Sequence, residues 1–292
     1  MTSIRRDVLV AVPVAFHADG ALDLEGSRRI LQHCTSSRVD GVFVLGTTGE
    51  FPSLSVAERG ELVRLTMAEV TDKRVVVHVG AASLREVLVL LDQAREAGAR
   101  EVAVITPYFL EVTDAAVTDF YRAVSEAADG IDVYVYVFRQ RTGKTISPEL
   151  LTRLLELPNV VGAKISGESP ERVAEYRAAV GPEPRIYTGG DEDLGRVETF
   201  GAQGVVSGTA AVFPHVFTDL VQAVADGDEG AVPEAERRVR QAVALLQGDM
   251  ARMKVALAAQ GVAAGTVRMA IEQPSASERS EIEAAVRDLT ER

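Results

Sequence analysis

Short apolar runs alternate with helix-patterned stretches along most of this chain, and the alternation limits the folds that it can adopt. Each run has the length of a strand and precedes a stretch with apolar residues at helical spacing, such as 56–70 or 84–97. Continuous apolar strands separated by helices are typical of a parallel sheet that is covered on both faces. The eight runs are residues 8–14, 41–45, 75–79, 101–105, 133–138, 160–164, 185–187 and 204–207.

Eight strand–helix units predict an α/β fold, the (β/α)8 TIM barrel. A doubly wound open sheet is the alternative, but such a sheet usually carries a glycine-rich phosphate loop after its first strand. Residues 14–20 do not resemble such a loop. From about Pro214 onward the pattern is helical only, which indicates a C-terminal helical extension. We expect a catalytic barrel in residues 1–225 and the extension in residues 226–292, packed on the barrel as one structural unit.

Serine residues mark where several helices begin. Ser55 and Glu58 have the spacing of a capping box, in which each side chain bonds the backbone N–H of the other residue. Ser83 and Ser147 precede two further helical stretches, and Pro148 stands at a first helical position. These residues predict the starts of three helices.

Charge and cysteine content exclude several classes of protein. The 292 residues carry a formal net charge of −12, whereas binding to nucleic acid needs a basic surface. The single cysteine, Cys34, cannot form an internal disulfide, and the four histidines share no spacing typical of metal ligands. We therefore expect no nucleic-acid partner and no metal site.

The distribution of apolar residues also bears on location. No stretch approaches the roughly 20 apolar residues that span a bilayer. Residues 1–7 lead into an apolar run at 8–12 that is too short for a secretory signal. We expect a cytoplasmic protein without a membrane partner.

Lys164 lies within an apolar run, residues 159–166, that has the pattern of a buried strand. Burial disfavours the ammonium form and lowers the pKa of a lysine, which turns it into an amine nucleophile able to form a Schiff base with a ketone. Alternatively, a lysine at a strand end extends to water or to a carboxylate. The residues at the other strand ends bear on this choice.

In a TIM barrel, catalytic groups lie at the carboxyl ends of the strands or in the loops that follow. Two glycines bracket Thr47 and Thr48 after the second strand, so hydroxyl and backbone N–H groups can converge there on one anion. A tight turn with solvent-facing threonines is the alternative. Tyr136 lies near the end of the fifth strand, and Arg141 follows it. Lysine, tyrosine, threonine and arginine together suit a 2-keto acid, because lysine forms the imine while the others move protons and hold the carboxylate.

Several segments match one family in register. They are Gly46-Thr47-Thr48-Gly49-Glu50, Leu54-Ser55, Glu58-Arg59, Thr106-Pro107-Tyr108, Tyr136 with Arg141-Thr142-Gly143, Gly162-Ala163-Lys164, and Gly204-Val205-Val206-Ser207. The chain thereby resembles the dihydrodipicolinate synthase/N-acetylneuraminate lyase family from about residue 8 to residue 289. The resemblance implies a (β/α)8 barrel with C-terminal helices, a homodimer or homotetramer, and covalent binding of pyruvate or a related 2-keto acid without a cofactor.

The resemblance also implies roles for residues at matching positions. Lys164 would form the imine, Tyr136 would shuttle protons, and Thr47 would relay them. Thr48 would bind the keto acid's carboxylate together with Thr47, and Arg141 would bind a carboxylate of the second substrate. The other substrate-binding candidates are Gly189, Asp191, Glu192 and Ser207. The first three resemble the stretch that contacts substrate hydroxyls in the sialic acid lyases, although acidic residues also favour a helix N-terminus.

Three segments depart from the synthase pattern. The synthases carry a second tyrosine after Tyr108, contributed across the dimer interface to a relay of hydroxyl groups, whereas this chain has Phe109. The asparagine and proline usual between the catalytic tyrosine and the arginine are replaced within residues 137–140. The usual Thr-Pro-Phe near the end of the first strand is Val-Ala-Phe at residues 14–16. We expect Tyr108 and Phe109 at a subunit interface beside the site.

We therefore predict a class I lyase that forms an imine between Lys164 and pyruvate or a related 2-keto acid. Aldol-type cleavage or condensation is the favoured reaction, with an aldehyde or a sugar acid as the partner substrate. Three alternatives stay open: a 4-hydroxy-tetrahydrodipicolinate synthase, a keto-deoxy-sugar-acid dehydratase, and a catalytically silent relative that binds a keto acid. The departures make lysine-pathway synthesis the less favoured activity, and residues 49–54 and 107–110 more closely resemble the branches of the family that act on sugar-derived keto acids.

Overall fold

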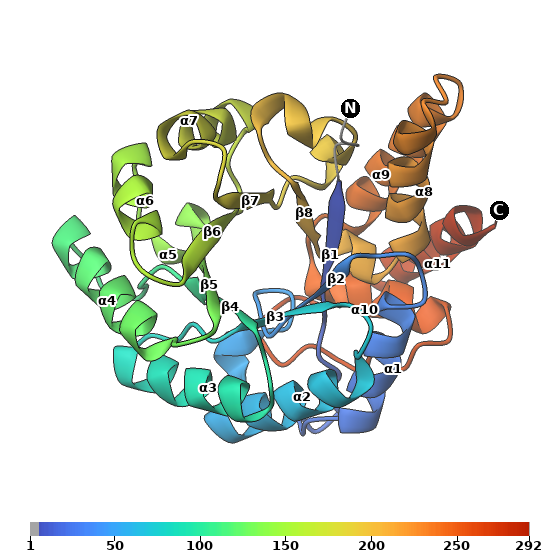
Figure 1. The fold of residues 1–292 in the computed structure, drawn as a ribbon. Helices are drawn as coiled ribbons and strands as arrows, with labels where there is room; N and C mark the ends of the chain where they lie inside the picture. Colours follow the sequence, from blue (N-terminus) through green and yellow to red (C-terminus); the bar gives the residue numbers. More distant parts are fainter. Residues whose placement is uncertain (1–5, 292) are drawn as a thin grey trace.

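The computed structural model describes residues 6–291, and the eight strands of this part close into a parallel barrel (Figure 1). Strands pair in sequence order, and β8 pairs with β1 to complete the ring. The predicted TIM barrel is confirmed. Residues 1–5, part of the start that was excluded as a secretory signal, lie outside the described residues. The strands are β1 (Asp7–Ala11), β2 (Gly41–Val44), β3 (Arg74–His78), β4 (Glu101–Ile105), β5 (Asp132–Val137), β6 (Val160–Ile165), β7 (Arg185–Thr188) and β8 (Gly204–Ser207).

Helices surround the barrel and follow its strands in the predicted order (Figure 1). The α-helices up to the last barrel unit are α1 (Leu24–Cys34), α2 (Val56–Glu69), α3 (Leu84–Glu96), α4 (Asp114–Ala127), α5 (Arg139–Thr142), α6 (Pro148–Leu155), α7 (Pro170–Val180) and α8 (Pro214–Asp226). The 3-10 helices are η1 (Phe51–Ser53), η2 (Asp191–Phe200) and η3 (Thr209–Ala211).

The predicted helix starts are confirmed by their caps. The backbone N–H of Ser55 donates to the Glu58 carboxylate at 2.8 Å, and the N–H of Glu58 donates to the Ser55 hydroxyl at 3.2 Å, which completes the capping box at the start of α2. The hydroxyls of Ser83 and Ser147 accept the backbone N–H of Glu86 and of Leu150 and so cap α3 and α6, and Pro148 occupies the first turn of α6. Each cap contributes about 1 kcal/mol to helix stability.

The barrel has two apolar layers, because successive residues of a strand point to opposite faces of the sheet. On β5, Val133, Val135 and Val137 face outward and pack into the layer beneath the helices. Tyr134 and Tyr136 alternate with them and face the barrel interior. This alternation carries Tyr136 to the upper end of the interior, next to the strand end.

The first strand is shorter than predicted, since it ends at Ala11 and not at residue 14. The N–H of Val12 still donates to the carbonyl oxygen of Phe43 on β2 at 3.0 Å. Pro13 has no N–H to donate and ends the ladder. The chain then turns outward, and Phe16 forms isolated bridges with Leu22 and with Gly265 of the C-terminal region.

Charged side chains fill the amino-terminal end of the barrel. Arg74 donates from Nη2 to Glu101 at 2.6 Å, and from Nη1 to the Tyr187 hydroxyl at 2.7 Å and to Asp7 at 3.2 Å. Tyr134 also donates its hydroxyl to Glu101, at 2.9 Å. This network occupies the floor of the barrel, opposite the end where the strand-end residues converge.

After α8 the chain forms three more α-helices, which lie beside α8 and α1 on one side of the barrel (Figure 1). They are α9 (Ala231–Leu246), α10 (Met250–Ala259) and α11 (Ala276–Thr290). α9 packs against α8 and η2, and α10 packs against α11. Within residues 6–291, no helix combines the length and apolar character that crossing a membrane requires. The division of the chain between residues 225 and 226 stays a prediction.

Candidate active site

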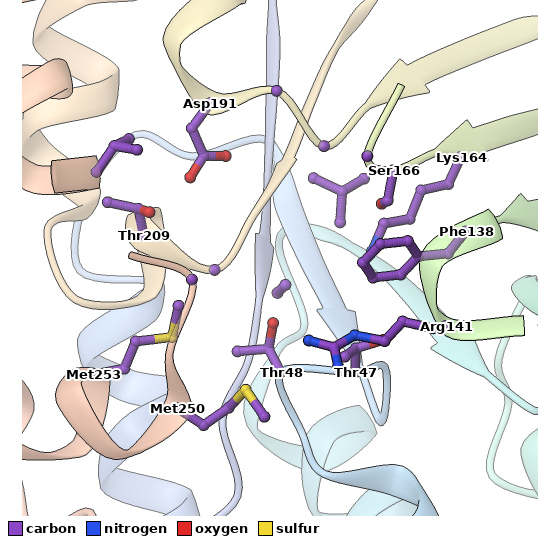
Figure 2. Close-up of a pocket in the computed structure, with 18 of the residues that line it drawn as sticks. Thr47, Thr48, Phe138, Arg141, Lys164, Ser166, Asp191, Thr209, Met250 and Met253 are labelled. Atoms are coloured by element: carbon purple, nitrogen blue, oxygen red, sulfur yellow. The ribbon is translucent and has the colours of Figure 1, made fainter. Parts of the chain in front are cut away.

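A cavity of about 510 Å³ lies at the carboxyl ends of the strands, where the sequence places the chemical groups. Figure 2 shows Lys164 and Phe138 on one side of it, and Asp191, Thr209 and Met253 on the other. The sequence-predicted residues that line it are Lys164, Tyr136, Thr47, Thr48, Arg141, Gly189, Asp191 and Glu192. The structure therefore brings together residues that are as far as 145 positions apart in the chain.

Lys164 lies near the end of β6 with 5% of its surface exposed. Its Nζ atom is 4.1 Å from the ring centroid of Phe43 and 4.2 Å from that of Tyr136. Burial lowers the pKa of the ammonium group below its ordinary value, and the nearby Tyr136 and Asp191 offset this only in part. The amine therefore gives up its proton more readily than an exposed lysine, and it can attack a carbonyl carbon.

Tyr136 connects the lysine to Thr47. Its hydroxyl lies 3.1 Å from the Thr47 hydroxyl, and either oxygen can donate the hydrogen bond. The ring of Tyr136 packs edge-on against Phe43, with 5.9 Å between the centroids. Two hydroxyls in contact, with the amine over the same ring, form a short path along which a proton can move.

The loop that carries Thr47 and Thr48 leaves β2 in an unusual conformation. Leu45 (φ 62°) at its start and Glu50 (φ 53°) at its end are left-handed, which is uncommon for residues with a side chain. His78 lies fully buried beneath the loop, with Nδ1 2.8 Å from the carbonyl oxygen of Leu45. Burial lowers the pKa of His78 well below its usual range, so the neutral ring donates this hydrogen bond. The hydrogen bond from the buried His78 ring to Leu45 thus holds the start of the loop in place.

Arg141 and Phe138 form the mouth of the cavity. The short helix α5 follows β5 directly and carries Arg141, whose side chain extends toward Thr47 and Thr48 (Figure 2). The guanidinium lies 5.7 Å from the ring centroid of Phe138, and that ring stacks on Tyr136 at 6.1 Å. A cation supported in this way can bind a carboxylate that enters the cavity.

Asp191 lies across the cavity from Lys164 (Figure 2). It begins η2, so it is both an acidic residue at a helix start and a cavity-lining residue. Burial raises the pKa of its carboxyl to about 6, although the hydroxyls of Thr209 and Ser207 favour the charged form. Near neutral pH such a group accepts hydrogen bonds from hydroxyls. Within residues 6–291, no three histidine, cysteine or acidic side chains are grouped so that they could hold a metal ion.

Ser207 was expected to bind substrate, but it does not line the cavity. Val206 faces the barrel interior and lines the cavity, so the next residue along β8 points to the opposite face. Ser207 is fully buried there, and its hydroxyl accepts the N–H of Ala210 at 2.9 Å. Its hydroxyl favours the charged form of Asp191, so we assign it a supporting role behind that residue.

Tyr108 and Phe109, the two aromatic residues that follow β4, lie outside the cavity. Tyr108 lines a second cavity of about 370 Å³, which shares Thr47 and Arg141 with the first. Phe109 is 87% exposed, and its backbone is left-handed with φ at 78°. The predicted subunit interface at these two residues stays a prediction.

The C-terminal helices supply a wall of the cavity that the sequence did not indicate. Met250 and Met253 of α10 and Val243 of α9 line the cavity, and Figure 2 shows both methionines below Thr209 and Asp191. The spacing of the two methionines was the available signal. It is equally typical of a helix face that packs into a core, so it could not identify a site.

The model of the dihydrodipicolinate synthetase family matches residues 5–289. An uncharacterized DapA-like lyase of Halobacterium salinarum is 32% identical over 285 residues, which cover 97% of this chain and 93% of the relative. The 4-hydroxy-tetrahydrodipicolinate synthase of Methanothrix thermoacetophila is 31% identical over 287 residues, 97% of this chain and 95% of that protein.

A solved structure gives the same extent of likeness. It is the crystal structure, in complex with pyruvate, of YagE, a prophage protein of E. coli K12 that belongs to the dihydrodipicolinic acid synthase family. It superposes with a TM-score of 0.90 and 25% sequence identity, over 97% of this chain and 98% of that chain. The likeness therefore includes the barrel and the C-terminal helices alike.

Proposed function

This chain belongs to the dihydrodipicolinate synthetase family and is a lyase, and we propose that it acts on pyruvate or a related 2-keto acid through an imine at Lys164. The observation that carries the proposal is the position of Lys164, buried between the rings of Phe43 and Tyr136 at the edge of the cavity that Thr47, Thr48 and Arg141 also line. The pyruvate bound in YagE, a relative of the same fold, supports this class of substrate.

The proposed reaction begins when the neutral amine of Lys164 attacks the keto carbon and water leaves. The protonated imine withdraws electrons from the neighbouring carbon, so a carbon–carbon bond there can break or form. Tyr136 and Thr47 move the protons that these steps require, along the 3.1 Å contact between their hydroxyls. Thr48 and the backbone of the same loop hold the carboxylate of the keto acid.

The second substrate is proposed to lie between the loop after β5 and the start of η2. Arg141 offers a cation for a carboxylate, and Asp191 with Glu192 and Gly189 offers acceptors for hydroxyl groups. This arrangement supports an aldehyde or a sugar-derived acid as partner, and hence aldol-type cleavage or condensation.

One specific alternative is 4-hydroxy-tetrahydrodipicolinate synthase. The relative from Methanothrix thermoacetophila carries that name, and the residues that the synthase pattern requires line one cavity here: Thr47, Thr48, Tyr136, Arg141 and Lys164. Phe109 disfavours this activity, because a phenyl ring cannot supply the hydroxyl that the synthases contribute from a neighbouring subunit. We also propose that Tyr108 and Phe109 lie at an interface between subunits of a homodimer or homotetramer.

Reduction with borohydride in the presence of pyruvate tests the proposal. Borohydride converts an imine into a stable amine, so mass spectrometry of the digested protein identifies the lysine that formed it. We expect an adduct on Lys164 and none on Lys254, a second buried lysine whose ammonium is paired with a carboxylate and which serves as an internal control. The Lys164→Ala variant should fold and give no adduct. An adduct with a longer keto-deoxy acid but none with pyruvate would assign the substrate to the sugar acids, whereas an adduct at another lysine, or none with any 2-keto acid, would contradict the imine mechanism.

A further inference from the structure

Glu50 ends the loop that carries the two threonines, and its carboxylate is fully buried. One carboxylate oxygen accepts a hydrogen bond from Lys254 at 2.8 Å. The other accepts the backbone N–H groups of Arg268 and Met269, each at 2.8 Å. Three donors from the C-terminal region therefore hold one side chain of the second strand–helix connection.

Lys254 lies on α10 with 2% of its surface exposed. Its ammonium also donates to the carbonyl oxygen of Thr266 at 2.5 Å and lies 4.6 Å from the ring centroid of Phe16. Burial lowers its pKa, and the Glu50 carboxylate opposes that shift. A buried ion pair of this kind is strongly disrupted when one partner is removed, because the other charge is left without compensation.

Glu50 is connected to the two threonines by a backbone hydrogen bond within the loop. The N–H of Glu50 donates to the carbonyl oxygen of Thr47 at 3.0 Å, within a tight turn. Because Glu50 is left-handed, its surroundings must hold that conformation, and the three donors to its carboxylate do so. α10, which carries Lys254, also presents Met253 to the cavity. The same helix thus anchors the loop and forms part of the wall.

We propose that Glu50 and Lys254 are positioning residues: their ion pair fastens the loop of residues 45–50 to α10 and so sets the place of Thr47 and Thr48 relative to Lys164. Neither residue touches the reacting atoms. The inference rests on the proposed function, since it concerns how the keto acid is held beside the imine-forming lysine.

The test measures borohydride trapping over a range of pyruvate concentrations, which separates the half-saturating concentration from the trapping rate at saturation. In Glu50→Gln and in Lys254→Met we expect the half-saturating concentration to rise by about tenfold to a hundredfold, as for a misplaced binding group. The adduct should still form on Lys164, and the rate at saturation should change less. Lys254→Arg retains the charge and should recover most of the affinity.

Glu58→Gln is the matched control. Glu58 binds the Arg268 guanidinium at 2.8 Å and so also joins the C-terminal region to the barrel, but from α2. Its own side chain does not bond Glu50, and the variant retains the backbone N–H of Arg268 that does. This variant should lower the melting temperature and leave the half-saturating pyruvate concentration unchanged. The double variant Glu50→Gln/Lys254→Met buries no charge, so it keeps the test available if a single variant fails to fold, and its half-saturating concentration should also rise.

The outcomes distinguish the positioning role of Glu50 and Lys254 from the proposed imine at Lys164. An adduct in the native protein, with the same half-saturating concentration in the Glu50 and Lys254 variants, would contradict the positioning role alone. An equal rise in Glu58→Gln would also contradict it, because general docking of the C-terminal region would then explain the effect. A native protein that forms no adduct on Lys164 with pyruvate or with a longer keto-deoxy acid would contradict the proposed function and, with it, this inference.

Discussion

Two buried lysines of this chain have different surroundings. Lys254 donates to the Glu50 carboxylate at 2.8 Å, so its ammonium is compensated. Lys164 faces the rings of Phe43 and Tyr136 instead, and burial lowers the pKa of both ammonium groups. Geometry therefore separates them: Lys254 is held by a carboxylate, whereas the Lys164 amine lines the cavity, where it suits the proposed attack on a keto carbon. The sequence indicated Lys164 from its place in an apolar strand, but it could not indicate the rings around it.

The Tyr136 hydroxyl gives a prediction at this scale. Tyr136→Phe keeps the ring beside Lys164 but removes the oxygen that contacts Thr47. We expect the rate of trapping at saturating pyruvate to fall by about a hundredfold or more, because proton transfer by a positioned side chain contributes that much. The melting temperature should change little, since the hydroxyl has a part-buried partner and the ring packing is retained.

Tyr134→Phe is the control for that measurement. Tyr134 faces the same interior of the barrel from the same strand, but its hydroxyl donates to Glu101 at the floor. Its loss should lower the melting temperature and leave the trapping rate at its native value. If Tyr136→Phe trapped pyruvate at the native rate, Tyr136 would have no part in the proton path.

At the scale of the element, the strands could be predicted and the cavity wall could not. Each strand is an apolar run between helical stretches, so local pattern alone locates it. The one sizeable error, the end of β1, arose because Pro13 interrupts pairing inside an apolar run. Met250 and Met253 lie on a helix that the sequence predicts, but the place of α10 over the barrel depends on distant contacts such as Lys254 with Glu50. Helical periodicity carries no information about those contacts.

The spacing of β1 and β8 gives a prediction for the elements. A Cβ atom at Gly204 would lie 2.0 Å from the backbone oxygen of Asp7, its paired residue on β1. Gly204→Ala therefore forces the two strands apart, and we expect the free energy of unfolding to fall by about 3 kcal/mol. Denaturant unfolding measures this change.

Gly230→Ala is the matched glycine substitution. A Cβ atom there would lie 3.3 Å from a side-chain oxygen of Asp228, at the start of α9. The free energy of unfolding should stay within about 0.5 kcal/mol of the native value. A Gly204→Ala protein as stable as Gly230→Ala would show that β1 and β8 can pair at a wider spacing between the strands than the structure indicates.

At the scale of the whole molecule, distant parts of the chain build the site together. Glu50 and Lys254 are hydrogen-bonded although they are 204 positions apart in the sequence, and Arg268 and Glu58 are hydrogen-bonded across 210 positions. Phe16 also bridges to Gly265, so the segment after α10 runs beside the first strand–helix connection. The loop of residues 45–50 is therefore held by contacts with the C-terminal region, although the sequence alone presented that region as a cap.

Asp191 is proposed to bind substrate, but its buried carboxylate lowers the free energy of unfolding of the whole molecule near neutral pH. Burial raises the pKa of its carboxyl from 3.8 to about 6. The folded protein therefore binds this proton more tightly than the unfolded chain does. By linkage, the free energy of unfolding falls as the pH rises from about 4 to about 6, and it stays lower at higher pH.

Asp191→Asn removes this titration, and it should raise the free energy of unfolding near neutral pH by about 1–2 kcal/mol. The gain should vanish near pH 4, where the native carboxyl is also protonated, and denaturant unfolding at both pH values measures it. Glu192→Gln, at the exposed neighbouring position, should change the free energy of unfolding near neutral pH by less than about 0.5 kcal/mol. Because Asp191→Asn also loses a charged acceptor inside the cavity, we expect this variant to bind a hydroxylated second substrate more weakly while it gains stability. A variant no more stable than the native protein near neutral pH would show that its surroundings already compensate the Asp191 charge in full.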